Sequence, residues 1–167
     1  MATVVNRETL EVRLSVNTPD YDPADWLINP AIPDAPVRHW EIVGDSLGLK
    51  DAAGIAEADA EYLIQQRQAH KDYLVEEFNA VLDARYAPSS QRFMIKMMSD
   101  AESGGLDSRH EYLESLWVWI QAGVAILLAT HQAVDEAEEF LAVTLNLTDW
   151  LAADPEVSIR TAGEIDG

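Results

Sequence analysis

The stretch from Leu116 to Ala129 constrains the fold of this chain most, because it is apolar nearly all round a helix. Its sequence, LWVWIQAGVAILLA, contains one strongly polar side chain, Gln121. A helix without a polar face is buried on several sides, within one chain or between chains. The stretch is shorter than the roughly 18 or more residues expected of a membrane span. We therefore predict the core of a helical bundle or of a subunit interface, and no membrane span.

A longer helical pattern surrounds this stretch, from Asp107 to Leu151. Asp107 and Ser108 stand where a side-chain oxygen can accept hydrogen bonds from the first turn. An unbroken helix of this length would span about 68 Å, so we expect a break or bend between Thr130 and Asp135. A turn is expected to restart at Thr148 or Asp149, around Trp150. Apolar residues recur every three or four positions: Leu113, Leu116, Trp117, Ile120, Val124, Leu127, Leu128, His131, Val134, Phe140, Leu141, Leu145 and Trp150.

Two more helices are expected before it. The first covers residues 51–86 and ends before Pro88, and a shorter one covers residues 91–102, between Ser89 or Ser90 and a glycine pair. The first has a polar middle in which Gln66 and His70 lie on or beside the apolar stripe. These two residues either form a polar layer that fixes the register of an oligomer or lie on an exposed stretch. The predicted fold class is mainly α, with three to four helices forming a bundle that can be oligomeric.

The front of the chain is expected to form a small β module of two or three strands. Leu10, Val12, Leu14 and Val16 alternate with polar residues, a period of two that predicts a half-buried strand. Residues 37–43 predict a second strand, closed by a turn at Gly44 and extended by Leu47 and Leu49. Residues 19–36 hold five of the seven prolines and predict an irregular loop.

We therefore predict that the chain has three parts. Residues 1–50 are a proline-rich β module for docking, residues 51–153 are the helical bundle, and residues 154–167 are a weakly ordered tail. A few short strands cannot bury a core alone, so the front module must lean on the helices or on another subunit.

Charge and composition limit the partners. The formal net charge is −19, which disfavours binding to nucleic acid phosphates, since such binding depends on Lys and Arg. After Arg109 the chain has one basic residue, Arg160, so its second half needs partners that are apolar or basic. The absence of cysteine excludes disulfides, thiolate metal ligands and thiol nucleophiles.

No combination of residues predicts catalysis. The four histidines do not follow the spacings of zinc or di-metal sites. The acids of the loop at residues 20–25 lack the glycine and the final Glu of a calcium loop. Nucleotide-binding glycine motifs and a nucleophile elbow are also missing. We expect no catalytic residue, no cofactor and no metal site, and therefore not an enzyme.

Residues 17–60 carry a resemblance. The run DYDPADWLINP, the spacer AIPDAP, then VRHWEIVGDSL and an acidic helix resemble the opening module of small accessory proteins encoded by tailed bacteriophages. There an INP…VPxRYWxxxGDxVxEM segment precedes a helical region, and many of these proteins are encoded among tail-fibre and structural genes. This chain departs from the pattern at His39, where Tyr is usual, and at LGLKD, where a Glu-Met pair would stand. The matching residues are Ile28, Asn29, Pro30, Pro36, Val37, Arg38, Trp40, Val43, Gly44 and Asp45.

The resemblance implies a structural protein of the phage virion, located in the tail region and present in the host cytoplasm during assembly. For tail fibres and collars it implies threefold or sixfold symmetry. We accordingly expect a homo-oligomer, a trimer or larger, whose helices meet through Leu116, Trp117, Ile120, Val124 and Leu127. We expect the front module to dock onto other phage structural proteins by strand pairing and through Trp26, Ile28 and Trp40.

Two alternatives remain open. The acidic surface would suit an inhibitor or nucleic-acid mimic that binds a basic host protein, with an affinity that high salt lowers. A helical, metal-dependent enzyme is the other alternative, and bound metal in a purified sample would reveal it.

Overall fold

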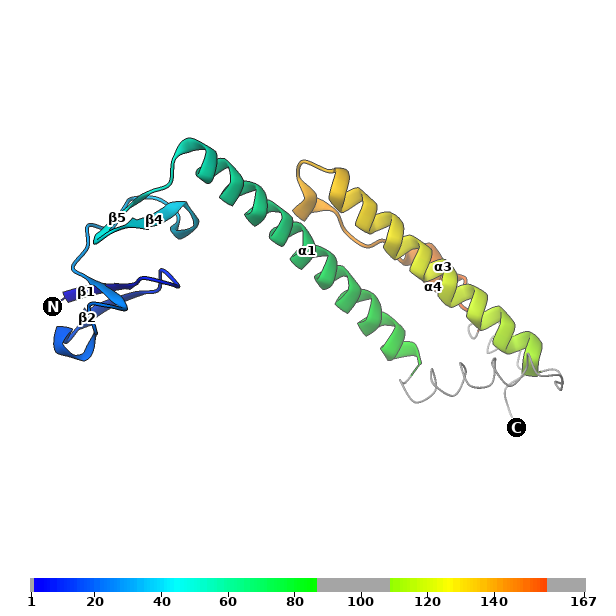
Figure 1. The fold of residues 1–167 in the computed structure, drawn as a ribbon. Coiled ribbons are helices and arrows are strands. Elements are labelled where there is room, and N and C mark those ends of the chain that lie inside the picture. Colours follow the sequence, from blue (N-terminus) through cyan, green and yellow to red (C-terminus); the bar gives the residue numbers. More distant parts are fainter. Residues whose placement is uncertain (1, 87–108, 156–167) are drawn as a thin grey trace. The chain divides into compact units, whose positions relative to one another are not determined.

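The computed structural model of this chain describes residues 2–86 and 109–155 (Figure 1). The chain forms two compact units, residues 1–65 and 66–167, and the long helix α1 (Ala52–Arg85) contributes to both. Asp51 caps α1, because its Oδ1 accepts a hydrogen bond from the Gly54 N–H at 2.7 Å. The first unit therefore contains the first turns of α1 in addition to the predicted front module of residues 1–50.

A three-stranded antiparallel sheet opens the first unit. Its central strand is β1 (Ala2–Asn6), which pairs with β2 (Val12–Val16) on one side and with β3 (Trp26–Ile28) on the other. Val4 and Val5 are completely buried. Consecutive residues of a strand point to opposite faces, so both faces of β1 are covered here. The short 3-10 helix η1 (Thr18–Asp20) lies in the proline-rich connection between β2 and β3.

Strand β2 confirms the predicted strand, but its expected burial is wrong at Leu14. The pairing with β1 shifts between Ala2 and Thr3, and Ser15 has a positive φ of 59°. This β-bulge disrupts the alternation of inward and outward side chains. As a result Leu14 is 70% exposed.

A hairpin follows, formed by β4 (Trp40–Val43) and β5 (Ser46–Leu49). The predicted turn at Gly44 is confirmed, and its φ of +61° suits glycine, which has no Cβ to clash. The three residues before β4 were expected to be part of the strand. They form the 3-10 helix η2 (Val37–His39) instead, closed by a hydrogen bond from the His39 N–H to the Pro36 carbonyl.

The predicted fold class is wrong in two respects. The front of the chain has five strands in two sheets rather than two or three strands. The described part of the chain has two long helices, α1 and α3 (Arg109–Glu136), and the five-residue α4 (Thr148–Ala152), which do not form a bundle of three to four helices. The helix predicted for residues 91–102 lies outside the described residues.

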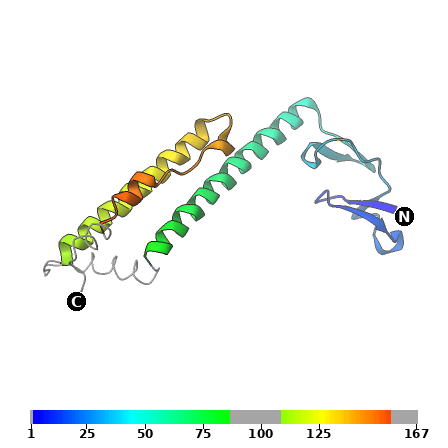
Figure 2. The ribbon, with the colours of Figure 1, turned by 180° about the vertical axis from the view of Figure 1, so that it is seen from behind.

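The reason for the second correction is the segment after α3. Helix α3 ends at Glu136, close to the expected break, and the chain returns along it through the 3-10 helix η3 (Phe140–Ala142) and α4 (Figures 1 and 2). We call residues 137–154 the return segment. It packs against both long helices and fills the place that a further long helix would take in a bundle. The expected turn around Trp150 is confirmed by α4.

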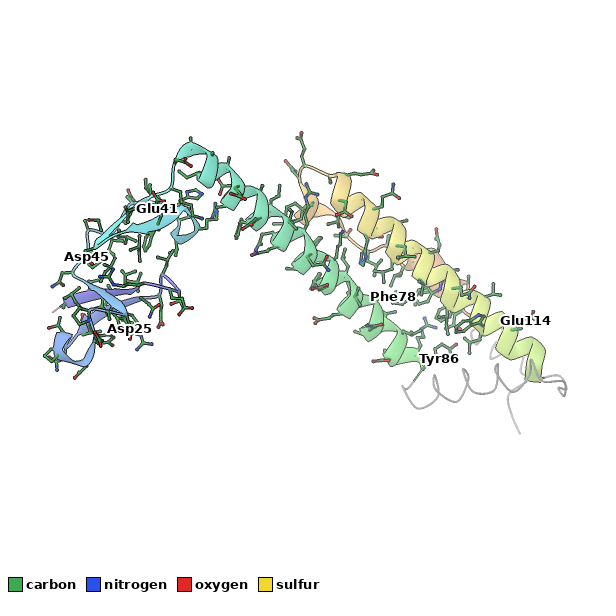
Figure 3. The ribbon with its side chains drawn as sticks, viewed as in Figure 1. Asp25, Glu41, Asp45, Phe78, Tyr86 and Glu114 are labelled. Carbon is green, nitrogen blue, oxygen red and sulfur yellow. The ribbon has the colours of Figure 1, made fainter. Side chains whose placement is uncertain are left out.

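Two tryptophans form the centre of the second unit. The rings of Trp119 on α3 and Trp150 on α4 stack with centroids 4.0 Å apart, and Phe78 of α1 stacks on Trp150 at 5.3 Å. Each indole N–H donates to the backbone carbonyl of the other tryptophan, at 2.7 and 2.6 Å. Figure 3 shows Phe78 on the side of α1 that faces α3. This pair therefore joins α3 and the return segment through both packing and hydrogen bonds.

The polar middle of α1 binds the end of α3. Arg67 donates to the carbonyls of Val134 and Ala137, and its guanidinium lies 4.8 Å from the centroid of the Phe140 ring. His70 Nε2 lies 2.8 Å from the Val143 carbonyl oxygen. The carbonyls at a helix end have no partner within the helix, so Arg67 satisfies those of Val134 and Ala137, while His70 contacts the return segment at Val143. His70, on or beside the apolar stripe of α1, therefore makes a contact within one chain.

Candidate functional site

The residues that carry the phage resemblance hold the first unit together. Asn29 and Thr3 exchange two hydrogen bonds, from the Thr3 N–H to Asn29 Oδ1 at 3.0 Å and from the Asn29 N–H to the Thr3 carbonyl at 2.7 Å. Arg7 donates to the Gly44 carbonyl at 2.9 Å and to Asp45 Oδ1 at 2.6 Å. Figure 3 shows Asp45 at the turn of the β4–β5 hairpin. Gly44 and Asp45 therefore connect the two sheets of this unit through Arg7, and Asn29 holds the end of β3 against β1 within one sheet.

Arg38 and His39 of η2, directly before the hairpin, bind the start of α1. Asp59 Oδ1 accepts a hydrogen bond from Arg38 Nε at 2.6 Å, and His39 Nε2 lies 2.7 Å from the same oxygen. The Arg38 guanidinium also lies 4.4 Å from the centroid of the Tyr62 ring. Hydrogen bonds from His39 and then Arg38 lower the pKa of Asp59 below its ordinary value of 3.8. His39, the departure from the usual Tyr, thus has a defined partner.

We predict that Asp59 makes the stability of the first unit depend on acidity. A carboxylate with a lowered folded pKa contributes stability that is complete above its ordinary pKa and is lost as the pH falls through the folded pKa. Asp59→Asn is expected to lower the urea midpoint at neutral pH, and this difference should vanish in strong acid. The midpoints would be followed at the amide resonances of β4 and β5. Glu57→Gln, an exposed acid on the same helix, is the control, and a difference that stays constant with pH would contradict the role of Asp59.

A surface hollow of about 410 Å³ lies beside this group. It combines apolar and charged side chains, and within the described ranges no cluster of three His, Cys, Asp or Glu residues could hold a metal ion. The hollow can receive a side chain of a partner, but it has no pairing of nucleophile and base. Its lining comprises Leu10, Val37, Arg38, Trp40, Lys50, Ala58, Glu61, Tyr62 and Gln65.

The predicted docking residues of the first unit are not free. Trp40 is 5% exposed, and its indole N–H donates to the Ala35 carbonyl at 2.9 Å. Trp26 is half-buried between the edge of the Tyr21 ring and the guanidinium of Arg13. Ile28 is half-buried at the end of β3. Their contacts within the chain mean that exposed neighbours are better placed to meet a partner.

The predicted interface residues of α3 fall on two sides of the helix. Leu116 and Leu127 are buried in the core of the second unit, and Ile120 packs against that core. Trp117 and Val124 are exposed, at 38% and 39%. The apolar pattern did not reveal Trp119 as a core residue, because every side of this stretch is apolar.

The most exposed large apolar side chains of β2, β4 and α3 were not predicted as sites. Leu14 and Val43 are 70% and 67% exposed in the first unit, and Val118 and Leu128 are each 61% exposed on α3. By length and composition alone, the stretch Glu114–Glu136 of α3 is long and apolar enough to cross a membrane, and 22% of its apolar part is buried inside the protein. In proteins generally, large contiguous apolar surfaces mark contacts with other molecules.

Comparison with protein-family models, with curated proteins and with solved structures finds no match for this chain.

Proposed function

We propose that this protein is a structural component of a tailed-phage virion, associated with the tail or its fibres. It docks onto other virion proteins through its first unit and associates with copies of itself through its helices. The observation that carries the proposal is that residues 17–60, which resemble the phage proteins, have two roles. Its polar residues build the first unit, while several of its large apolar side chains remain on the surface: Ile32, Val37, Val43 and Leu49.

The geometry of the first unit favours a protein partner. The β4–β5 hairpin pairs with no further strand in the part of the chain that the structure describes, so its edges can accept a strand of a partner. A rigid framework also lowers the entropy cost of binding, because Arg7 and Asn29 already fix the loops. The net charge of −19 opposes a role in binding nucleic acid.

We predict that Val43→Asp reduces the amount of this protein in virions. The test is to supply tagged variants during infection by the phage that encodes the protein and to quantify the tag in gradient-purified particles. Burying an apolar side chain of this size contributes about 1.5–3 kcal/mol, so its replacement by a charge should lower occupancy about tenfold or more. Val43 is exposed, and circular dichroism should therefore show an unchanged fold.

Ser46→Asp is the matched control. Ser46 pairs directly with Val43 across the hairpin, so the control adds the same charge at the same place without removing an apolar side chain. It is expected to enter particles nearly as well as the wild type. Absence of the wild-type protein from purified particles would refute the proposed function, and equal incorporation of both variants would refute docking through Val43.

A further inference from the structure

The outward side of α3 has the spacing of a coiled-coil seam. Five exposed residues follow one another here at alternating steps of three and four: Val118, Gln121, Ala125, Leu128 and Gln132. We call these five residues the outer seam. A repeat of this kind brings one side of a helix against a second helix over several turns. The opposite side of α3 holds Trp119 and Gly123 and is already covered by the return segment.

The charges of the chain argue for a second copy as the partner. Residues 115–134 contain no Asp, Glu, Lys or Arg, although the whole chain has a net charge of −19. Two copies repel each other wherever their acidic surfaces meet, and the outer seam is a strip where they approach without opposing carboxylates. A basic partner would find no acid there to pair with. The residues beside the seam are also uncharged: Trp117, Ala122, Val124 and Ala129.

The seam is complementary to itself when one copy is reversed. An antiparallel alignment that sets Ala125 against Leu128 of the second copy also sets Gln121 against Gln132. At the end of the seam the same alignment sets Val118 against Asp135, so no two carboxylates oppose each other. The first pair places a small side chain opposite a large one, and the second places two amides together. Gln132 Nε2 donates to Glu136 at 2.7 Å, so its Oε1 remains as an acceptor for Gln121. A parallel alignment in register would instead set Glu114 against Glu114 and Asp135 against Asp135.

We infer that two copies of this chain pair antiparallel through the outer seam. The inference rests on the self-association in the proposed function and names the surface and the partner for it. The sequence predicts a trimer or a larger assembly, whereas the inferred contact is twofold. A larger symmetric assembly can contain such a contact.

Engineered cysteines test the register, because the natural chain has no cysteine. Gln121→Cys and Gln132→Cys are purified separately, then oxidised alone and as a mixture, and disulfide-linked dimers are counted on a non-reducing gel. If the pair is antiparallel, disulfide-linked dimers form in the mixture. Neither variant forms them when it is oxidised alone. Cross-linking of each variant with itself would show parallel helices and overturn the inference, as would the absence of any cross-link.

Charge variants test the surface independently. Leu128→Glu places a carboxylate in the seam and is expected to turn the dimer into a monomer in light scattering. Leu141→Glu is the matched control, since Leu141 is 65% exposed in the same unit but lies outside the seam, and it should stay dimeric. A dimeric Leu128→Glu variant would overturn the inference, and so would a monomeric wild type that floats with phosphatidylcholine vesicles, which would point to a membrane. Docking is measured separately with Val43→Asp, so either claim can fail without the other.

Discussion

Gly123→Ala is expected to destabilise the second unit by about 3 kcal/mol or more. A Cβ atom at this position would lie 2.5 Å from Cε2 and 2.6 Å from Cζ2 of Trp150. The ring cannot move away freely, because it stacks on Trp119 and its N–H donates to the Trp119 carbonyl at 2.6 Å. Relief of the clash would therefore break buried packing and a buried hydrogen bond together.

The sign of this effect is its strongest test. In an exposed part of a helix, Gly→Ala stabilises by about 1 kcal/mol, because alanine favours the helix. Urea unfolding of the wild type and of the variant gives the free energy of unfolding directly. In a Trp150→Ala background the clash disappears, so the same substitution should become neutral or stabilising. A stabilised Gly123→Ala single variant would contradict the stacking of Trp150 against α3.

Asp154→Ala is expected to cost about 2–3 kcal/mol of the free energy of unfolding. The residue is 1% exposed, and its Oδ2 accepts from Arg85 at 2.7 Å while its Oδ1 accepts from the Tyr86 hydroxyl at 2.8 Å. Hydrogen bonds between charged groups are stronger than neutral ones. The Arg85 side chain is about one third exposed, so water can solvate it after the loss, which keeps the cost below that of breaking a fully buried pair.

Asp149→Ala is the control for this prediction. Asp149 is exposed in the first turn of α4, where an acid contributes about 0.3–1 kcal/mol through the helix dipole. Urea midpoints of both variants would be compared with that of the wild type. Equal small losses would show that Asp154 behaves as part of a weakly ordered tail, as the sequence predicts for residues 154–167.

The parts of the fold that depend on local signals could be predicted from the sequence. Helix α1 begins after Asp51 because that side chain caps it, and the hairpin turns at Gly44 because glycine tolerates a positive φ. Strands β1 and β3 were not predicted, since each is short and is stabilised by a partner far along the chain. The return segment was also missed, because its path depends on the fit of Trp150 over Gly123.

The contacts of the motif residues and the outward side of α3 could also not be predicted from the sequence alone. The motif residues Asn29, Arg38 and Gly44 could be recognised from the sequence, but their partners Thr3, Asp59 and Arg7 lie far from them along the chain. On α3 the apolar residues extend all round the helix, so their spacing alone cannot separate the inner side from the outer one. Contacts with the return segment make that distinction, and they leave the outer seam exposed.

The absolute mass of the wild-type protein in solution, measured by light scattering after size exclusion, tests self-assembly most directly. The outer seam contains no charged residue, so its pairing should not depend on salt. We predict twice the chain mass of 18.5 kDa, or a multiple of that pair, at both low and high salt. A mass of one chain at both salt concentrations would contradict pairing through the seam and would favour a protein that joins its partner as a single copy.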